Sequence, residues 1–328
     1  MSERTLPYVK AFNEGMHQVM AADPDVFLCG EDVAGYGGVF HMFDGLLDSY
    51  GERRVFDTPI SEQAIIGLGV GAAARGLRPV VDLMFMDFLG VCMDQVANQA
   101  AKMKYMYGGT VSVPLTITTA GGAGLSSAAQ HSQSLEAWIA HVPGLKVVMP
   151  STPYDAKGLI VSAVRDNNPV IVVLNKKLLG TKGIVPEEIY EVPIGVAAIV
   201  RAGTDVSVVA IGRMVNESLA AADILAEEGI SIEVIDPRSV QPLDTATITA
   251  SVKRTNRALV VHEAVRFGGI GAEIAAQIQD EAFDYLDAPV LRIGAPFCPV
   301  PFSPVLEAAY VPDAARIAEG VRRLVKRG

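Results

Sequence analysis

The sequence is poor in cysteine. Its three cysteines, Cys29, Cys92 and Cys298, are odd in number, far apart and embedded in apolar sequence. This arrangement argues against a disulfide framework and against a zinc site, both of which need cysteines at suitable spacing. We therefore expect buried thiols in a reducing compartment, and hence a cytoplasmic protein.

An excess of positive charge and long apolar runs are also missing. The chain has 27 Lys and Arg residues against 37 Asp and Glu residues, a formal net charge of −10. This balance argues against binding to nucleic acid, which depends on neutralising phosphate charges. No run approaches the ~18 apolar residues that a membrane span requires, and the N-terminus has no signal-peptide pattern. We expect a chain that is neither exported nor embedded in a membrane.

Several catalytic motifs are absent as well. The sequence has no Gly-x-x-x-x-Gly-Lys-Ser/Thr, no Gly-x-Ser-x-Gly and no His-x-x-x-His. A P-loop nucleotidase, a serine hydrolase with a nucleophile elbow and a zinc enzyme are therefore disfavoured.

The chain does contain a repeated alternation of short β-branched runs and helical stretches. Its 328 residues exceed the usual size of a single core, so we expect two domains. The alternation predicts an α/β fold in which each domain is a mainly parallel sheet flanked by helices. The predicted domains are residues 1–177 and 193–328. Residues 178–192 lose the alternation, collect charges, Gly and Pro, and are the predicted linker.

The predicted elements follow from this alternation. Strands are expected at 26–29, 79–84, 114–119, 146–149 and 169–174 in the first domain, and at 205–211, 231–236, 258–262 and 289–293 in the second. Helices of the second domain are expected at 216–228, 271–283 and 313–326.

The segment Asp57-Thr-Pro-Ile-Ser-Glu62 is the most informative part of the chain. A helical pattern follows it, in which Ser61 would be the N-cap and Glu62 would lie in the first turn, where the helix dipole favours a carboxylate. Taken alone, an ordinary first-turn glutamate is the commoner explanation. The glycines at 67, 69 and 71 fall inside this helical pattern, which favours close helix packing over a dinucleotide-binding turn.

Other candidate side chains follow predicted strands, where parallel sheets bind ligands. Glu31 and Asp32 come directly after the first strand, although a solvated acidic loop would have the same composition. His131 lies in a loop after the Gly-rich segment 120–124 and is a candidate acid, base or hydrogen-bond donor. His262 ends a later strand, and for this residue we favour a structural role.

Read together, several segments resemble the beta subunit of the thiamine-diphosphate-dependent first component of 2-oxoacid dehydrogenase complexes. The resemblance runs from about residue 5 to the C-terminus. The segments that carry it are Gly30-Glu-Asp-Val-Ala34, Asp57-Thr-Pro-Ile-Ser-Glu62, Arg78-Pro, Met84-Phe-Met-Asp-Phe88, Asp94-Gln, Tyr105-Met-Tyr-Gly-Gly109, Ala128-Ala-Gln-His-Ser-Gln-Ser134, Pro143-Gly-Leu-Lys-Val-Val148, Tyr154-Asp-Ala-Lys-Gly-Leu159 and Arg165-Asp-Asn-Asn-Pro169.

The resemblance implies a thiamine-diphosphate pyrimidine-binding fold followed by a transketolase C-terminal-like fold, with thiamine diphosphate as cofactor. Glu62 matches the carboxylate that would hydrogen-bond a ring nitrogen of the cofactor's aminopyrimidine and assist its activation. Glu31 matches a second position near that ring. Ile60, Met84 and Phe88 match positions that hold the ring by apolar and aromatic contact.

The resemblance also implies partners. The family's Gly-Asp-Gly, which holds the diphosphate and magnesium, is absent from this chain, so magnesium would be held mainly by an alpha subunit. The implied assembly is an α2β2 heterotetramer that works with a lipoyl-bearing acyltransferase component. The 50% hydrophobic content fits a tight subunit interface. His131 matches the histidine that faces the reacting centre, where it would steer the substrate or the lipoyl group, or transfer a proton.

Some family members hold a potassium ion with backbone carbonyls and a carboxylate. The matching positions here are Leu115, Ala163, Val164, Asp166 and Asn168. An ordinary turn before Pro169 explains the composition of this segment equally well.

The substrate implied by the resemblance is acetoin or pyruvate. The segments 183–190 and 295–307 look most like acetoin dehydrogenase beta subunits, with pyruvate dehydrogenase second. Two departures put acetoin in doubt, because Leu125-Ser-Ser127 and Phe297-Cys298 replace an Arg and a His-Thr that are common there. The alternatives are a branched-chain 2-oxoacid dehydrogenase, a split transketolase-like enzyme and a noncatalytic scaffold.

Overall fold

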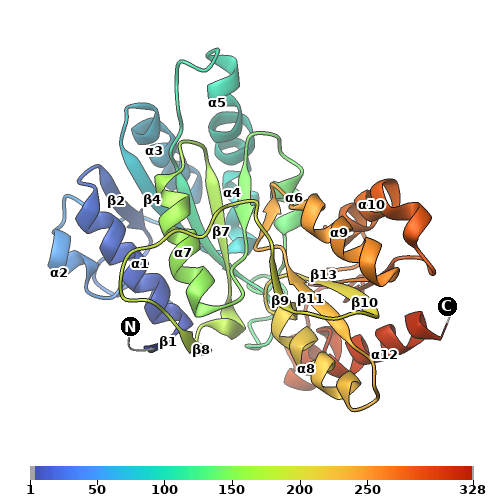
Figure 1. Cartoon of the computed structure of the whole chain (residues 1–328). Coiled ribbons are helices and arrows are strands. Elements are labelled where there is room, and N and C mark those ends of the chain that lie inside the picture. Colours follow the sequence, from blue (N-terminus) through green and yellow to red (C-terminus); the bar gives the residue numbers. More distant parts are fainter. Residues whose placement is uncertain (1–3, 327–328) are drawn as a thin grey trace. The chain divides into compact units, whose positions relative to one another are not determined.

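The computed structural model describes residues 4–326 and divides into two compact units (Figure 1). The first unit runs to residue 121 and resumes at 138–194, and the second comprises 122–137 and the chain from 195 onward. The domain boundaries expected from the sequence stay a prediction, because compact packing and independent folding are different properties. The outermost residues of those boundaries, 1–3 and 327–328, lie outside the described part of the chain.

The first unit is built on a parallel sheet whose strands run in the order β6-β7-β5-β4-β2-β3. The strands expected from the sequence are confirmed, with small shifts at their ends. Their bounds are β2 Val26–Gly30, β4 Arg78–Phe85, β5 Thr116–Gly121, β6 Lys146–Val148 and β7 Val170–Asn175. The short strand β3 Val55–Asp57 was not expected from the sequence. A separate antiparallel pair joins β1 Thr5–Pro7 to β8 Lys182–Ile184.

Helices cover both faces of this sheet (Figure 1). Val80 of β4 belongs to the core that α1 and α7 bury, and the next residue, Val81, faces α3 on the other side, as the two-residue period of a strand requires. A Cβ at Gly69 of α3 would lie 2.7 Å from the Val81 side chain and 2.8 Å from that of Leu115. Gly69 therefore allows close packing of a helix on the sheet, and the expected contact between helices is not its role.

The helical elements of the first unit have these bounds: α1 Tyr8–Ala22, α2 Leu46–Tyr50, α3 Glu62–Ala74, η1 Met86–Phe88, α4 Leu89–Asp94, η2 Gln95–Ala100, α5 Ala101–Met106, α7 Pro153–Arg165 and η3 Lys176–Leu178. Helix α6 Glu136–Ala140 lies where the chain re-enters the first unit.

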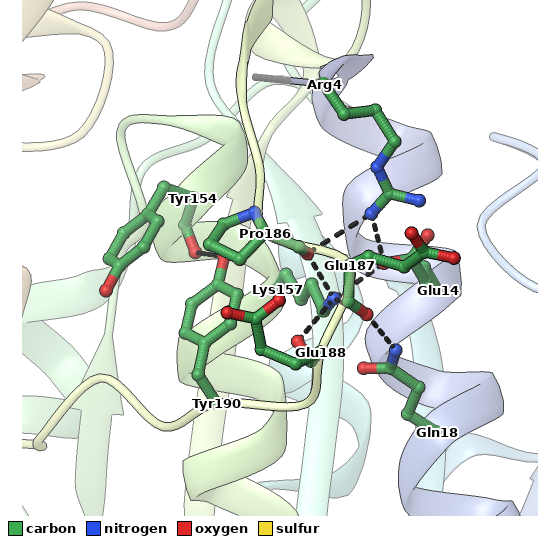
Figure 2. Close-up of polar contacts among 9 residues, drawn as sticks. All are labelled: Arg4, Glu14, Gln18, Tyr154, Lys157, Pro186, Glu187, Glu188 and Tyr190. Carbon is green, nitrogen blue, oxygen red and sulfur yellow. Dashed lines mark hydrogen bonds and ion pairs between the residues drawn. The ribbon is translucent and has the colours of Figure 1, made fainter. Parts of the chain in front are cut away.

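A buried lysine fixes the predicted linker against the first unit (Figure 2). Lys157 of α7 is fully buried, and its Nζ donates hydrogen bonds to the carbonyls of Pro186 (2.7 Å), Glu188 (3.0 Å) and Glu187 (3.1 Å). The same ammonium forms an ion pair with Glu14 of α1 at 2.6 Å. Burial opposes ionisation of Glu14, but hydrogen bonds from Arg4 and Lys157 outweigh it and hold the pKa of Glu14 below its usual value. This part of the linker is therefore held in place by charge.

The second unit repeats the α/β arrangement around strands in the order β14-β13-β10-β11-β9. All neighbours are parallel except β9, which pairs antiparallel at the edge. Val206 and Val208 pack in the core with α8 and α12, whereas Ser207 faces Ser251 and Thr255 of α9. The mainly parallel fold expected for this half is therefore confirmed.

The bounds in the second unit are β9 Ala198–Arg201, β10 Val206–Ala210, α8 Met214–Ala226, β11 Ile232–Asp236, β12 Ser239–Gln241, α9 Thr245–Thr255, β13 Ala258–Val265, α10 Gly271–Ala282, η4 Phe283–Tyr285, β14 Leu291–Ala295, α11 Pro304–Tyr310 and α12 Ala314–Val325.

The cysteine prediction is correct for two thiols and wrong for the third. Cys29 and Cys92 are buried, and burial is the main cause that raises the pKa of each to about 12. Cys298 is exposed, because it lies in the irregular segment that follows β14. Along residues 4–326, none of the helices combines the length and the apolarity that crossing a bilayer would take.

Candidate active site

The candidate site in the first unit forms where adjacent parallel strands end at one edge of the sheet. Gly30 of β2 lies beside Asp57 of β3 on one side and beside Asp82 of β4 on the other. The segments that follow these strands therefore emerge together, as ligand-binding segments do in parallel sheets. These segments contribute Glu31, the stretch from Thr58 to Glu62, and η1 Met86–Phe88, and the end of β4 adds Met84.

Glu62 is the first residue of α3, as the sequence predicted, and Ser61 occupies the N-cap position. The Ser61 hydroxyl makes no capping hydrogen bond in the described chain, so its expected capping role is wrong. Glu62 itself is half-buried at the positive end of the helix dipole. The start of α3 fixes the position of the Glu62 backbone, and the carboxylate is accessible to a hydrogen-bond donor of a ligand.

Glu31 and Glu62 come from the segments that follow two neighbouring strands, β2 and β3. Burial raises the pKa of Glu31 above its ordinary value, and the negative charges of Glu62 and Asp32 raise it further. The same edge thus holds several carboxylates, and their negative charges act on Glu31. Such groups are typical of sites that exchange protons.

Met84 lies at an irregularity in β4. The register of β4 against β5 shifts between Asp82 and Phe85, and Met84 has a φ of 58°, in the left-handed region that a long side chain rarely adopts. An Asp82 oxygen accepts a hydrogen bond from the Met84 N–H at 3.3 Å, which helps to hold this conformation. Bulges of this kind redirect a side chain at the end of a strand.

Apolar and aromatic groups complete this edge. The Phe88 ring packs edge-on against Phe85 with 5.7 Å between ring centroids, and Phe85 packs edge-on against Phe40 at 5.4 Å. Ile60 is 82% exposed, which is unusual for a large aliphatic side chain. These side chains offer apolar surface beside the carboxylates.

Asp82 is a residue that the sequence reasoning missed. It is fully buried in β4, its carboxylate accepts a hydrogen bond of 2.7 Å from the Thr118 hydroxyl, and burial raises its pKa to about 7. The signal was present in the sequence, since a carboxylate in the middle of the apolar run 79–84 stands out. Asp82 is the strand partner of Gly30, the residue before Glu31, so it lies next to the site.

His131 belongs to the second unit, in the irregular segment between β5 and α6. It is half-buried, and the segment around it contains Ser126 and Ala128 with φ values of 53° and 58°. Its role as a candidate catalytic residue stays a prediction.

The candidate potassium ligands lie around the end of α7 and the start of β5. Arg78 donates to the carbonyl of Val164 at 3.0 Å and to that of Asp166 at 3.1 Å. Burial opposes ionisation of Asp166, but its ion pair with Lys146 and hydrogen bonds from Asn168 outweigh it and hold the pKa of Asp166 below its ordinary value. The carbonyls of Leu115 and Ala163 accept backbone bonds from Val170 and Asp166.

His262 has the structural character that the sequence favoured. The ring is fully buried, it pairs through Nδ1 with the Ala264 carbonyl at 3.1 Å, and burial lowers its pKa to about 4. Cβ atoms at Gly269, Gly271 and Gly294 would approach the ring to 2.7, 2.5 and 2.9 Å, so glycines make room for it.

Acid is expected to destabilise the protein through His262. Its folded-state pKa of about 4 lies below the ordinary value of 6.5, so the unfolded state takes up a proton first as the pH falls. This contribution to stability is complete above pH 6.5 and is lost between 6.5 and about 4, up to about 3 kcal/mol. The measurement is the unfolding free energy of the wild type minus that of His262→Phe at each pH. This difference isolates the effect of His262, because the carboxyl groups titrate in both proteins. A difference that does not change with pH would contradict the prediction.

Comparison with known proteins agrees with this geometry. Residues 4–182 match the family model "Transketolase, pyrimidine binding domain", and residues 195–317 match "Transketolase, C-terminal domain". A solved structure described as a split-gene transketolase, an inactive beta4 tetramer, has a TM-score of 0.81 and covers 98% of this chain and 99% of its own. At 21% identity, that likeness bears on the fold alone. The chain is thus a two-domain protein of the transketolase type.

Curated relatives define the family more narrowly. The beta subunits of acetoin:2,6-dichlorophenolindophenol oxidoreductase from Cupriavidus necator and Bacillus subtilis are each 48% identical, covering 99% and 96% of this chain and 99% and 95% of their own. The pyruvate dehydrogenase E1 beta subunit of Bacillus subtilis is 44% identical over 99% of this chain and 100% of its own. The chain belongs to the family of beta subunits of the first component of 2-oxoacid dehydrogenase complexes, as its sequence motifs indicated.

Proposed function

We propose that this chain is the beta subunit of a thiamine-diphosphate-dependent enzyme that cleaves acetoin or decarboxylates pyruvate and transfers the two-carbon acyl unit to lipoamide. The observation that carries the proposal is the pair of carboxylates, Glu31 and Glu62, at the edge of the first unit's sheet. The membership of the family supports it.

The residues at this edge fit the aminopyrimidine half of the cofactor. Glu62 offers a carboxylate oxygen at the start of α3 for a hydrogen bond with a ring nitrogen. Met84, Phe88 and the exposed Ile60 offer apolar surface to the ring. Thiamine diphosphate, when bound, supplies a nucleophilic carbon and stores the electron pair that the substrate releases.

The protein's own contribution is proton exchange and orientation. With the cofactor bound, Glu62 would exchange a proton with the ring nitrogen. Glu31, whose pKa is raised by burial and further by the charge of Glu62, would adjust the charge beside it. His131 steers the substrate or the lipoyl group, or moves a proton. Both roles of His131 are open to test.

The proposed partners are an alpha subunit, in an α2β2 heterotetramer, and a lipoyl-bearing acyltransferase component. The alpha subunit would supply the diphosphate and magnesium site, since this chain has no Gly-Asp-Gly. At the end of α5, Tyr105, Met106 and Tyr107 are 85%, 74% and 60% exposed, which supports a covering partner.

We also propose a cytoplasmic location, because Cys29 and Cys92 are free and buried thiols. Cell fractionation tests this location.

We propose a potassium ion as a further ligand of the first unit. The set Leu115, Ala163, Val164, Asp166 and Asn168 would supply oxygen atoms. Each carbonyl that already accepts one hydrogen bond retains a second lone pair. The positive charges of Arg78 and Lys146 lie nearby and would repel a potassium ion. The oxygen atoms would therefore have to contact the ion closely to hold it.

Acetoin is favoured over pyruvate by the identity figures. The two acetoin relatives are each 48% identical, whereas the pyruvate dehydrogenase relatives from rice and Bacillus subtilis are 44–46% identical. A branched-chain 2-oxoacid is the next alternative. A split transketolase-like enzyme would also use Glu62 but would release a ketose.

The test is cofactor-dependent dye reduction by this chain mixed with an alpha subunit that carries Gly-Asp-Gly. Acetoin, pyruvate and branched 2-oxoacids are compared, and each subunit is also assayed alone. We expect activity only in the mixture, highest with acetoin, and faster heat inactivation in sodium than in potassium buffer. A complex that forms but reduces no dye with any substrate would reject the catalytic proposal in favour of a scaffold.

A further inference from the structure

Two buried carboxylates hold the start of the loop that carries His131. The Ala123 N–H donates to Glu263 Oε1 at 2.5 Å, and the Gly124 N–H donates to Glu307 Oε1 at 2.7 Å. The Ser126 N–H donates to the other Glu307 oxygen at 2.9 Å. Three amides within four residues of the loop are therefore bound by side chains from β13 and α11, more than a hundred residues further along the chain.

Burial makes these contacts strong. Glu263 and Glu307 are 7% and 3% exposed. A carboxylate removed from water is costly unless donors surround it, and backbone N–H groups are such donors. Glu307 uses one oxygen for each of two amides, and its second oxygen also lies 3.4 Å from the Ser126 hydroxyl. These hydrogen bonds fix the backbone of the loop. They are not part of the backbone hydrogen bonding that forms helix α11.

The loop needs such support because its backbone is strained. Ser126 and Ala128 both have a positive φ, at 53° and 58°, although neither is glycine. Conformations of this kind persist only where surrounding contacts impose them. Without the carboxylate, the loop would relax toward ordinary backbone angles, and His131, three residues beyond Ala128, would move with it.

We propose that Glu307, assisted by Glu263, is a positioning residue that sets the orientation of His131 by holding the backbone of residues 123–126. The proposal rests on the proposed function of His131 at the reacting centre. Neither glutamate contacts the substrate in this scheme. Each acts through the loop.

The first test is hydrogen–deuterium exchange of peptides covering 122–135 in the assembled complex. Glu307→Gln replaces one acceptor oxygen by an NH2 group, which faces a backbone N–H and cannot accept its hydrogen bond. The exchange rate of the loop amides is therefore expected to rise about tenfold, as for the loss of one hydrogen bond. Glu233→Gln is the matched control, since Glu233 is also buried but pairs with Arg254. Equal exchange of this loop in both variants would overturn the proposal.

The second test separates positioning from mere stability by a double-mutant cycle with His131→Ala. Glu307→Gln is expected to lower kcat/KM about tenfold in the wild type and to have little further effect once His131 is absent. A full, additive loss in the His131→Ala background would overturn the proposal. Should Glu307→Gln fail to assemble, Glu263→Gln, which alters the acceptor of the Ala123 N–H, replaces it in both tests. An unchanged activity of His131→Ala alone would instead reject the role proposed for His131, whatever the exchange data show.

Discussion

Replacement of Glu62 by glutamine is expected to lower turnover of the assembled enzyme by about 10²–10⁴-fold, the usual contribution of a positioned proton-transfer group. Glutamine has the same shape and keeps one oxygen acceptor, so the apolar contacts around it persist. It cannot share a proton with the cofactor's ring nitrogen. The loss should therefore appear in kcat, with the substrate KM little changed. Steady-state dye reduction measures both parameters.

The matched control for Glu62→Gln is Glu52→Gln. Glu52 is an exposed glutamate in the turn between α2 and β3, so its replacement changes the net charge by the same amount away from the site. Size-exclusion chromatography should find both variants assembled with the alpha subunit. Wild-type turnover in Glu62→Gln would remove Glu62 from the catalytic machinery.

Replacement of Lys157 by methionine is expected to destabilise the first unit by about 3–5 kcal/mol, the usual cost of breaking a buried charged pair. Methionine has a similar length but no ammonium, so the carbonyls of residues 186–188 lose their shared donor (Figure 2). Glu14 keeps only Arg4 as a cationic partner at 2.8 Å. Urea unfolding of the wild type and the variant measures the difference.

Lys10→Met is the control for this prediction. Lys10 lies on α1 and pairs with Asp44 at the same kind of distance, 2.8 Å, but both side chains are substantially exposed. Solvent screening limits such pairs to about 0–1 kcal/mol. Hydrogen exchange of residues 186–190 should rise only in Lys157→Met. Equal destabilisation by the two substitutions would mean that burial of Lys157 has no special effect.

Much of the fold is predictable because it depends on local patterns. The β-branched runs at 26–29 and 258–262 are strands, and the helical periods at 271–283 and 313–326 are helices, with small changes at their ends. The start of α3 at Glu62 also follows from local sequence, since Thr58-Pro-Ile-Ser61 cannot extend the helix backward. The motif resemblance then indicated the family, which the comparisons confirm.

The site was less predictable, because several of its features depend on residues that are distant in the chain. Met84 was singled out by resemblance, but its positive φ follows from the register shift between β4 and β5. Asp82 was overlooked, since its raised pKa requires burial that the strand's neighbours provide. Cys298 was expected to be buried because its neighbours in the sequence are apolar, but the structure shows it exposed.

The sequence by itself determined most of the central strands, the helix-start carboxylate Glu62 and the family, because these depend on periodicity and contiguous motifs. It did not predict short elements such as β3 and β9. Only the tertiary structure decided that Glu31 and Glu62 follow neighbouring strands, that Lys157 binds the linker and that Glu307 binds the loop that carries His131. The hydrogen bonds of Lys157 to the linker and of Glu307 to the loop join residues from 29 to 183 positions apart. Their formation depends on how the sheets and helices pack, which no local pattern encodes.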